Sequence, residues 1–189
     1  LVAAQGTPES IDWKSNWAVE PGFDINIDAA GFQFPTSIAF VPHPGDSPKD
    51  PLYFVTELKG SVKVVTNDRT VLTFAKDFFT LRPDKGEVRI IDQEVGMAGI
   101  CLVPEEGYLF VTFSYHDSND MLRNNIVRFQ STPGTFSIAP TSQIDFTQVF
   151  AHYPSAPSHQ IGGCQVDGGL LYVSVADAHQ TEQSQRLDT

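Results

Sequence analysis

His159 and Asp177 are the side chains in this sequence whose types and placement best suit acid–base chemistry. His159 stands in the run Ser158-His-Gln-Ile-Gly-Gly163, and Asp177 follows the apolar run Leu170-Leu-Tyr-Val-Ser-Val175. An imidazole, with a reference pKa of about 6.5, takes up the proton of a hydroxyl group at neutral pH. A carboxylate on the other ring nitrogen fixes the tautomer and raises the basicity. From the residues alone, a solvated loop histidine and a turn-forming aspartate are open alternatives.

The elements that position these side chains are expected to be strands. No window of eleven or more residues keeps its apolar residues at the 3.6-residue rhythm of a helix. With 14 Gly, 13 Pro and 14 Phe residues, the sequence favours short strands and tight turns. At 189 residues and 41% hydrophobic content, the chain is long enough to bury a core as one domain or a large part of one.

An internal repeat indicates how these strands are organised. Each copy has an apolar strand pattern, a polar or Gly/Pro turn, and a second strand pattern that contains an aromatic residue and Val. The copies are 35–42 with 51–57, 97–104 with 107–113, and 161–167 with 168–175. Aligning Ala39, Cys101 and Cys164 gives a period of 62 to 63 residues. Each copy is therefore predicted to form a β-hairpin.

A period of this length fits one four-stranded antiparallel blade of a β-propeller. We therefore expect an all-β chain with an N-terminal extension over residues 1–21 and a partial propeller over 22–189. Blade one is expected at about 35–80, blade two at about 97–150, and the start of blade three at about 158–189. About two and a half blades are then present in this sequence.

The segment 23–28 alternates apolar and polar residues, which predicts a half-buried strand. This strand would suit the place of the terminal strand that completes the last blade of a propeller, and its partner blade is expected to lie outside this sequence. Its polar side chains also mimic the start of a calcium-binding loop. However, Ala29 stands where that loop needs Gly, and Pro35 stands where it needs a bidentate Glu. The strand is the favoured interpretation, and no metal site is predicted in this sequence.

The two cysteines fall at equivalent positions in successive inner strands of the predicted blades. Cys101 and Cys164 do not form a metal-binding pair. We expect small core residues here rather than a disulfide, because neighbouring blades splay apart and a disulfide requires a short Cβ–Cβ distance.

Charge and hydropathy exclude several classes of partner. With 12 basic and 23 acidic residues, the net charge is −11, which repels phosphate backbones and anionic lipid. We therefore expect no nucleic-acid partner, and no apolar run approaches the roughly 20 residues that span a bilayer. The acidic charge and the low Lys content suit a secreted or periplasmic protein.

Four segments, in order along the chain, carry a family resemblance. They are Tyr53-Phe-Val-Thr-Glu57, Glu94-Val-Gly-Met-Ala-Gly-Ile-Cys-Leu-Val-Pro104, Ser158-His-Gln-Ile-Gly-Gly163 continued by residues 169–177, and Gln185-Arg-Leu-Asp188. Together they resemble the motifs of the glucose/sorbosone dehydrogenase family, whose members are soluble sugar dehydrogenases linked to pyrroloquinoline quinone (PQQ). The histidine motif is the most specific of the four.

The resemblance implies a propeller of six blades with the quinone over its top face, near the axis. A six-bladed ring at this period needs about 370 residues, so we expect about half of the ring to lie outside this sequence. The implied reaction is oxidation of an aldose at its anomeric carbon by hydride transfer to PQQ. The small-molecule partner is then a sugar, with an external electron acceptor as a second partner.

The resemblance also implies roles for individual residues. His159 matches the general base and Asp177 its acidic partner, while Glu94 and Gln160 match the edge of the sugar and cofactor site. Calcium is implied as a second cofactor, and the main ligands of PQQ and calcium are expected beyond residue 189. The sequence departs from the family pattern at Ile161, at Ala176 where Gly is usual, and at Cys164.

Two other functions remain open at this point. A non-catalytic extracellular propeller would bind a carbohydrate or a protein through the same top-face loops. A hydrolytic propeller such as a lactonase would use a metal held by Glu, Asn and Asp side chains, to which Glu94 and Asp177 could contribute, although the histidine motif argues against it.

Overall fold

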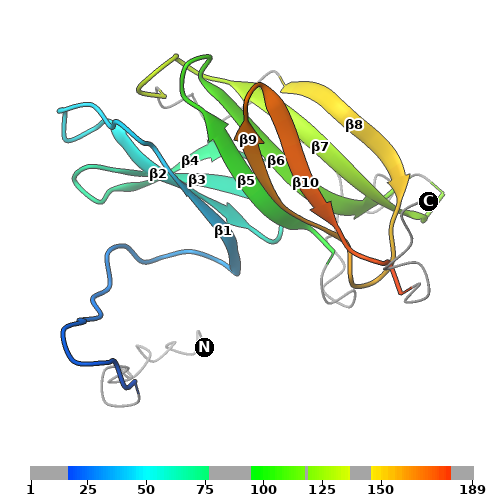
Figure 1. The fold of residues 1–189 in the computed structure, drawn as a ribbon, viewed down its shortest axis with the longest axis horizontal. Helices are drawn as coiled ribbons and strands as arrows, with labels where there is room; N and C mark the ends of the chain where they lie inside the picture. Colours follow the sequence, from blue (N-terminus) through cyan, green and yellow to red (C-terminus); the bar gives the residue numbers. More distant parts are fainter. Residues whose placement is uncertain (1–16, 77–94, 118, 137–145, 180–189) are drawn as a thin grey trace, which may run out of the picture.

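The computed structural model describes residues 17–76, 95–117, 119–136 and 146–179 (Figure 1). Within these ranges the chain is all-β, with ten strands. No helix in the described part of the chain is long and apolar enough to cross a membrane. The predicted site residue Glu94 and the motif at 185–188 lie outside the described residues.

The strands form two four-stranded antiparallel sheets and one hairpin. Blade one contains β1 (Pro35–Phe40), β2 (Pro51–Glu57), β3 (Ser61–Thr66) and β4 (Val71–Ala75) in sequence order. Blade two contains β5 (Met97–Val103), β6 (Tyr108–His116), β7 (Leu122–Gln130) and β8 (Phe146–Pro154) in the same order. Blade three contains the hairpin of β9 (Ile161–Asp167) and β10 (Leu170–Val175). This arrangement is part of a β-propeller, as the repeat predicts.

The first strands of the three blades are neighbours in space. β5 contacts both β1 and β9, so these three strands form the inner side of the structure. β9 lies beside β5 and β6, while β8 is at the opposite edge of its sheet from β5 (Figure 1). The residues that precede β1, β5 and β9 therefore meet at one end of the inner strands.

Phenylalanine rings fill the core between blades one and two. Phe74 of β4 meets Phe54 of β2 edge to face, with ring centroids 5.2 Å apart. Phe74 also meets Phe129 of β7 edge to face at 6.0 Å. All three rings are fully buried, and edge-to-face pairs add stabilisation beyond the area they bury. The core thus fixes blade one against blade two.

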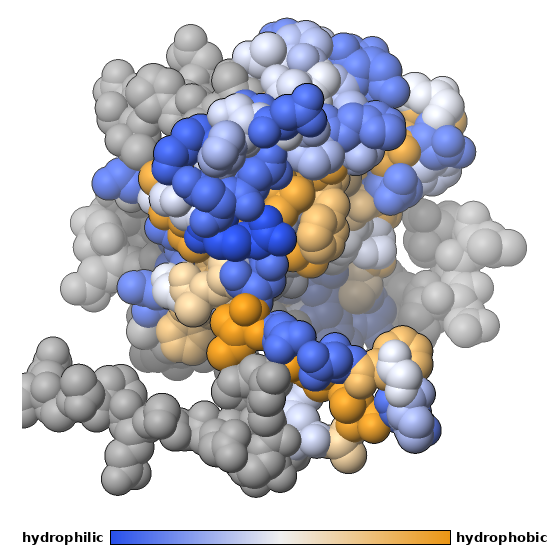
Figure 2. All heavy atoms as spheres, turned by 90° about the vertical axis from the view of Figure 1, so that its left-hand side faces the viewer, coloured by the Kyte–Doolittle hydropathy of each residue, from blue (hydrophilic) through white to orange (hydrophobic). Residues whose placement is uncertain are grey.

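The strand predicted over residues 23–28 is not formed. No described strand pairs with this segment, and Phe23 and Ile27 are 75% and 63% exposed. Its end is held by Asp28, which accepts hydrogen bonds from Tyr53 Oη at 2.7 Å and Arg69 Nε at 2.6 Å. Burial and the bond to Asp28 raise the pKa of Tyr53 to about 12, so the phenol stays a donor at neutral pH. The face shown in Figure 2 exposes hydrophobic residues among hydrophilic ones, along this segment and on the body of the molecule.

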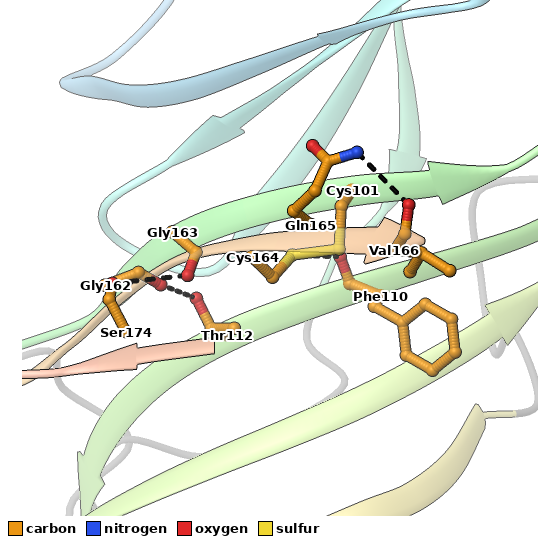
Figure 3. Close-up of a disulfide and its surroundings, with 9 residues drawn as sticks. All are labelled: Cys101, Phe110, Thr112, Gly162, Gly163, Cys164, Gln165, Val166 and Ser174. Atoms are coloured by element: carbon orange, nitrogen blue, oxygen red, sulfur yellow. Dashed lines mark hydrogen bonds between the residues drawn. A yellow bond between two sulfur atoms is a disulfide. The ribbon is translucent and has the colours of Figure 1, made fainter. Parts of the chain in front are cut away.

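Blades two and three are joined covalently through their inner strands. Cys101 of β5 and Cys164 of β9 form a disulfide with a Cα–Cα distance of 5.7 Å (Figure 3). The expectation of two separate core cysteines is therefore wrong. Blades splay apart toward their outer strands, whereas the inner strands converge, and Gly99 has no side chain to hold β5 away from β9.

Hydrogen bonds and glycine contacts continue the same junction. Thr112 Oγ1 of β6 donates to the carbonyl oxygen of Gly162 over 2.6 Å (Figure 3). A Cβ atom on Gly99 would lie 2.8 Å from that carbonyl oxygen and 2.9 Å from Cα of Gly163. The close approach of the two blades therefore depends on glycine at position 99.

We expect Gly99→Ala to lower the free energy of unfolding by about 1–3 kcal/mol, because the new methyl group overpacks the junction. Gly163→Ala is the matched control, since nothing lies within 4 Å of its added Cβ. Urea denaturation of both variants measures the difference. Equal losses in the two variants would show that the junction tolerates a methyl group at position 99.

Candidate active site

A cleft of about 530 Å³ opens at the end of the inner strands where β1, β5 and β9 begin. All three blades contribute to it. Its lining residues are Phe34, Pro35, Thr36, Leu58, Met97, Ala98, His159, Gln160, Ile161 and Ala176. A volume of this size is typical of sites that bind small molecules.

The structure brings His159 and Asp177 together at this cleft. His159 Nδ1 lies 2.9 Å from Asp177 Oδ1, and the two side chains are 52% and 13% exposed. A carboxylate at this nitrogen favours the tautomer with the proton on Nδ1, which leaves Nε2 as the basic nitrogen. The pair thus has the geometry of a base and its orienting carboxylate.

Backbone hydrogen bonds beyond the β9–β10 hairpin hold this pair in place. The amide of Ala176 donates to the carbonyl of Gln160, and the amide of Ala178 donates to the carbonyl of His159, each over 3.1 Å. The two chain segments therefore stay paired past the last strand residues. Because His159 and Asp177 lie on these opposite segments, the extension of the hairpin brings their side chains into contact.

His179 is a candidate site residue that the sequence interpretation missed. Its ring stacks on the ring of His159, with centroids 4.8 Å apart and an angle of 7° between the planes. Its Nε2 contacts Ser158 Oγ, and its backbone amide donates to Asp177 Oδ1 over 3.1 Å. The only signal in the sequence is its position two residues after Asp177. The stack restricts the orientation of the His159 ring.

Gln160 lines the same cleft but is buried, at 8% exposed. Its amide nitrogen donates to the carbonyl of Ala156, and its amide oxygen accepts from the hydroxyl of Ser114 in β6. These contacts tie the start of β9 to blade two. A direct contact of Gln160 with a ligand stays a prediction.

The pKa of Asp177 is lowered from its ordinary value, chiefly by the hydrogen bond from His159. Burial opposes this effect, and the backbone amide of His179 adds a smaller lowering. A lowered pKa in the folded state means that this bond stabilises the fold at pH values above the unfolded carboxyl pKa of about 3.9. The stabilisation is lost as the pH falls through the lowered value.

We therefore expect the Asp177 carboxyl carbon to titrate below pH 3.9 in an NMR experiment on the folded protein. In His159→Phe, which keeps a planar ring but removes the donor, the titration should move up toward that reference value. An Asp177 titration that is the same in both proteins would contradict the hydrogen bond. Asp167, at the far end of β9, is the internal control.

Within the described ranges, no three His, Cys, Asp or Glu side chains group together in a way that could hold a metal ion. The residues that line the cleft also include no Lys or Arg side chain. The described residues thus supply an acid–base pair and an apolar wall, and they do not by themselves supply a site for calcium or for a carboxylated quinone.

Comparison with known sequences gives one family. The model of the family described as "Glucose / Sorbosone dehydrogenase" matches residues 32–189, which include all three blades. No curated protein matches the sequence.

Solved structures with the same fold include several dehydrogenases. An oxidoreductase described as a glucose dehydrogenase from Thermus thermophilus is 21% identical, with a TM-score of 0.57 over 83% of this chain. A second glucose dehydrogenase is 16% identical, with a TM-score of 0.58 over 82% of this chain. The apo form of the soluble aldose sugar dehydrogenase from Escherichia coli is 14% identical, with a TM-score of 0.52 over 84%. The chain spans 41% to 42% of the length of these three structures.

Proposed function

This chain belongs to the glucose/sorbosone dehydrogenase family, and on that premise we propose that the complete protein oxidises an aldose sugar at its anomeric carbon. The observation that supports this most directly is the His159–Asp177 contact at the rim of a cleft of small-molecule size. The family resemblance adds the finer part of the proposal, which is that bound PQQ would supply the hydride acceptor and that an external acceptor would take up the electrons.

In the proposed reaction His159 acts as the general base. Its Nε2 takes the proton of the anomeric hydroxyl as the C–H bond of the same carbon breaks and its electron pair leaves as hydride. The C–O bond becomes a carbonyl, so the product is the lactone of the sugar. Asp177 stabilises the imidazolium that forms, and the ring of His179 keeps the imidazole in its orientation.

PQQ and calcium belong to the proposal through the family resemblance alone. Bound PQQ would supply the two-electron acceptor that balances the loss of hydride from the sugar. The described residues do not form a site for either group, so no step assigned here to this chain depends on their contacts. Their ligands are proposed to come from the remaining blades.

The test is reduction of an artificial electron-acceptor dye by the complete protein with glucose, with and without added PQQ and calcium. We expect dye reduction that requires the sugar and increases when both cofactors are added. A complete protein that binds no quinone would overturn the proposal. Sugar binding without any dye reduction would instead support the alternative, a non-catalytic extracellular propeller.

We further propose that the protein is secreted or periplasmic. The disulfide between Cys101 and Cys164 supports this, because such bonds persist mainly in oxidising compartments. Cell fractionation followed by thiol labelling of the protein tests it. Recovery of the protein from the cytoplasm with two free thiols would contradict the proposed location.

A further inference from the structure

Each of the three blades has a residue in the left-handed backbone conformation just before its inner strand. Five residues before the aligned positions Ala39, Cys101 and Cys164 stand Phe34, Gly96 and His159. Their φ angles are 51°, 141° and 57°. The repeat therefore places one such residue per blade at the end of the inner strands where the cleft opens.

The three positions differ in what they present to the cleft. In blade two the position has no room for a side chain, because a Cβ on Gly96 would lie 2.1 Å from the carbonyl oxygen of Leu58. In blades one and three the position carries a side chain, and both Phe34 and His159 line the cleft. The proposed base thus has a counterpart in blade one, and that counterpart is an aromatic ring.

The stability of the fold does not account for phenylalanine at position 34. A bulky residue at positive φ is strained by about 1–3 kcal/mol, and Phe34 also precedes a proline, which restricts its backbone further. The ring is 62% exposed. The hydrogen bond that closes this end of blade one, from the Leu58 amide to the Phe34 carbonyl over 2.9 Å, uses only backbone atoms. Glycine would make the same bond without strain.

The ring of Phe34 has one side covered by a cation. Lys59 Nζ lies 5.4 Å from the ring centroid. A cation at this distance interacts with the electron-rich face of the ring, so a ligand that packs on the ring would use the opposite face. Such a face attracts polarised C–H groups and excludes water from them.

We propose that Phe34 is the aromatic wall of the sugar subsite, against which the C–H face of a pyranose ring packs while its anomeric hydroxyl reaches His159. The inference rests on the proposed function. It adds a preference for aldoses in the closed ring form that present a continuous C–H face. Because the contact is the same in the ground state and the transition state, it contributes to KM rather than to kcat.

The experiment compares Phe34→Gly and Phe34→Tyr with the complete wild-type protein, with glucose as the substrate. We expect Phe34→Gly to raise KM about tenfold with little change in kcat, and to leave the melting temperature equal to or above that of wild type. Phe34→Tyr keeps the ring and should keep KM within about twofold. Phe40→Ala is the control, since Phe40 is also 62% exposed in blade one but does not line the cleft.

Three outcomes would overturn the inference. An unchanged KM for glucose in Phe34→Gly would show that the ring of Phe34 does not contact the sugar. A weaker affinity for PQQ with an unchanged sugar KM would assign the ring to the cofactor. A lower melting temperature would show that the ring packs within the complete protein.

Glucose binding measured by saturation-transfer NMR, with no electron acceptor present, separates this inference from the proposed function. If the wild type binds glucose and Phe34→Gly does not, the subsite stands even when no sugar is oxidised. If the wild type oxidises glucose and both proteins bind it equally, the function stands and the subsite is wrong.

Discussion

Replacement of His159 by Gln is expected to lower kcat/KM for sugar oxidation by the complete protein about 10²- to 10⁴-fold, the range that a general base contributes. Gln keeps a hydrogen-bonding side chain of similar length but does not take up a proton at neutral pH. Asp177 then has no imidazolium to stabilise. Dye reduction with glucose at saturating PQQ and calcium measures the effect.

The pH profile makes this prediction specific to a base. The wild-type rate should decrease at acidic pH, where the imidazole of His159 can no longer take up a proton. The residual rate of His159→Gln should not show this decrease. His43→Gln is the control, because His43 is exposed and lies beyond the other end of β1, outside the cleft. Equal activity of wild type and His159→Gln would refute the assignment of the base.

Replacement of both Cys101 and Cys164 by Ala is expected to lower the free energy of unfolding by about 4 kcal/mol, because the disulfide closes a long loop in the unfolded chain. The two residues are 63 positions apart in the sequence. The double variant avoids a lone reactive thiol. Denaturant titration of the complete protein gives the two free energies.

Reduction of the wild-type protein provides the internal control for that measurement. A reducing agent should move the unfolding midpoint of wild type toward that of the double variant. The midpoint of the double variant should not change on reduction. A midpoint that does not respond to reduction in either protein would mean that the disulfide adds nothing to stability.

The sequence was sufficient to predict the blades because the repeat can be read along the chain without knowing how the blades pack. Alternation within each strand and the 62- to 63-residue period do not depend on distances between blades. The confirmed features are therefore the all-β propeller fold and the family. The segment 23–28 forms no strand in the described part of the chain. Alternation indicates a strand but does not supply the neighbouring strand that must pair with it, and the blade that this segment was expected to complete is not part of this sequence.

The disulfide depends on the distance between blades, which the period does not contain. The relevant signal was present in Gly99, which lacks the side chain that would keep β5 away from β9. The sequence did not predict His179 as a site residue, for a related reason. It lies in a turn where Ala178 and His179 both have positive φ, of 48° and 65°, a conformation that alanine rarely adopts. The roles of His159, Asp177, Gln160 and Glu94 stay predictions.

The disulfide has a further consequence for the imidazole at the start of the same strand. Cys164 lies only five residues after His159, and its partner belongs to blade two. The segment that follows His159 is therefore anchored to blade two twice, by the Gln160–Ser114 hydrogen bond and covalently at Cys164. The entropy cost of ordering the imidazole ring of His159 is then incurred when the chain folds and the disulfide forms. Under the proposed function, a substrate that enters the cleft would meet a preorganised imidazole, whose angular freedom is already small before binding begins.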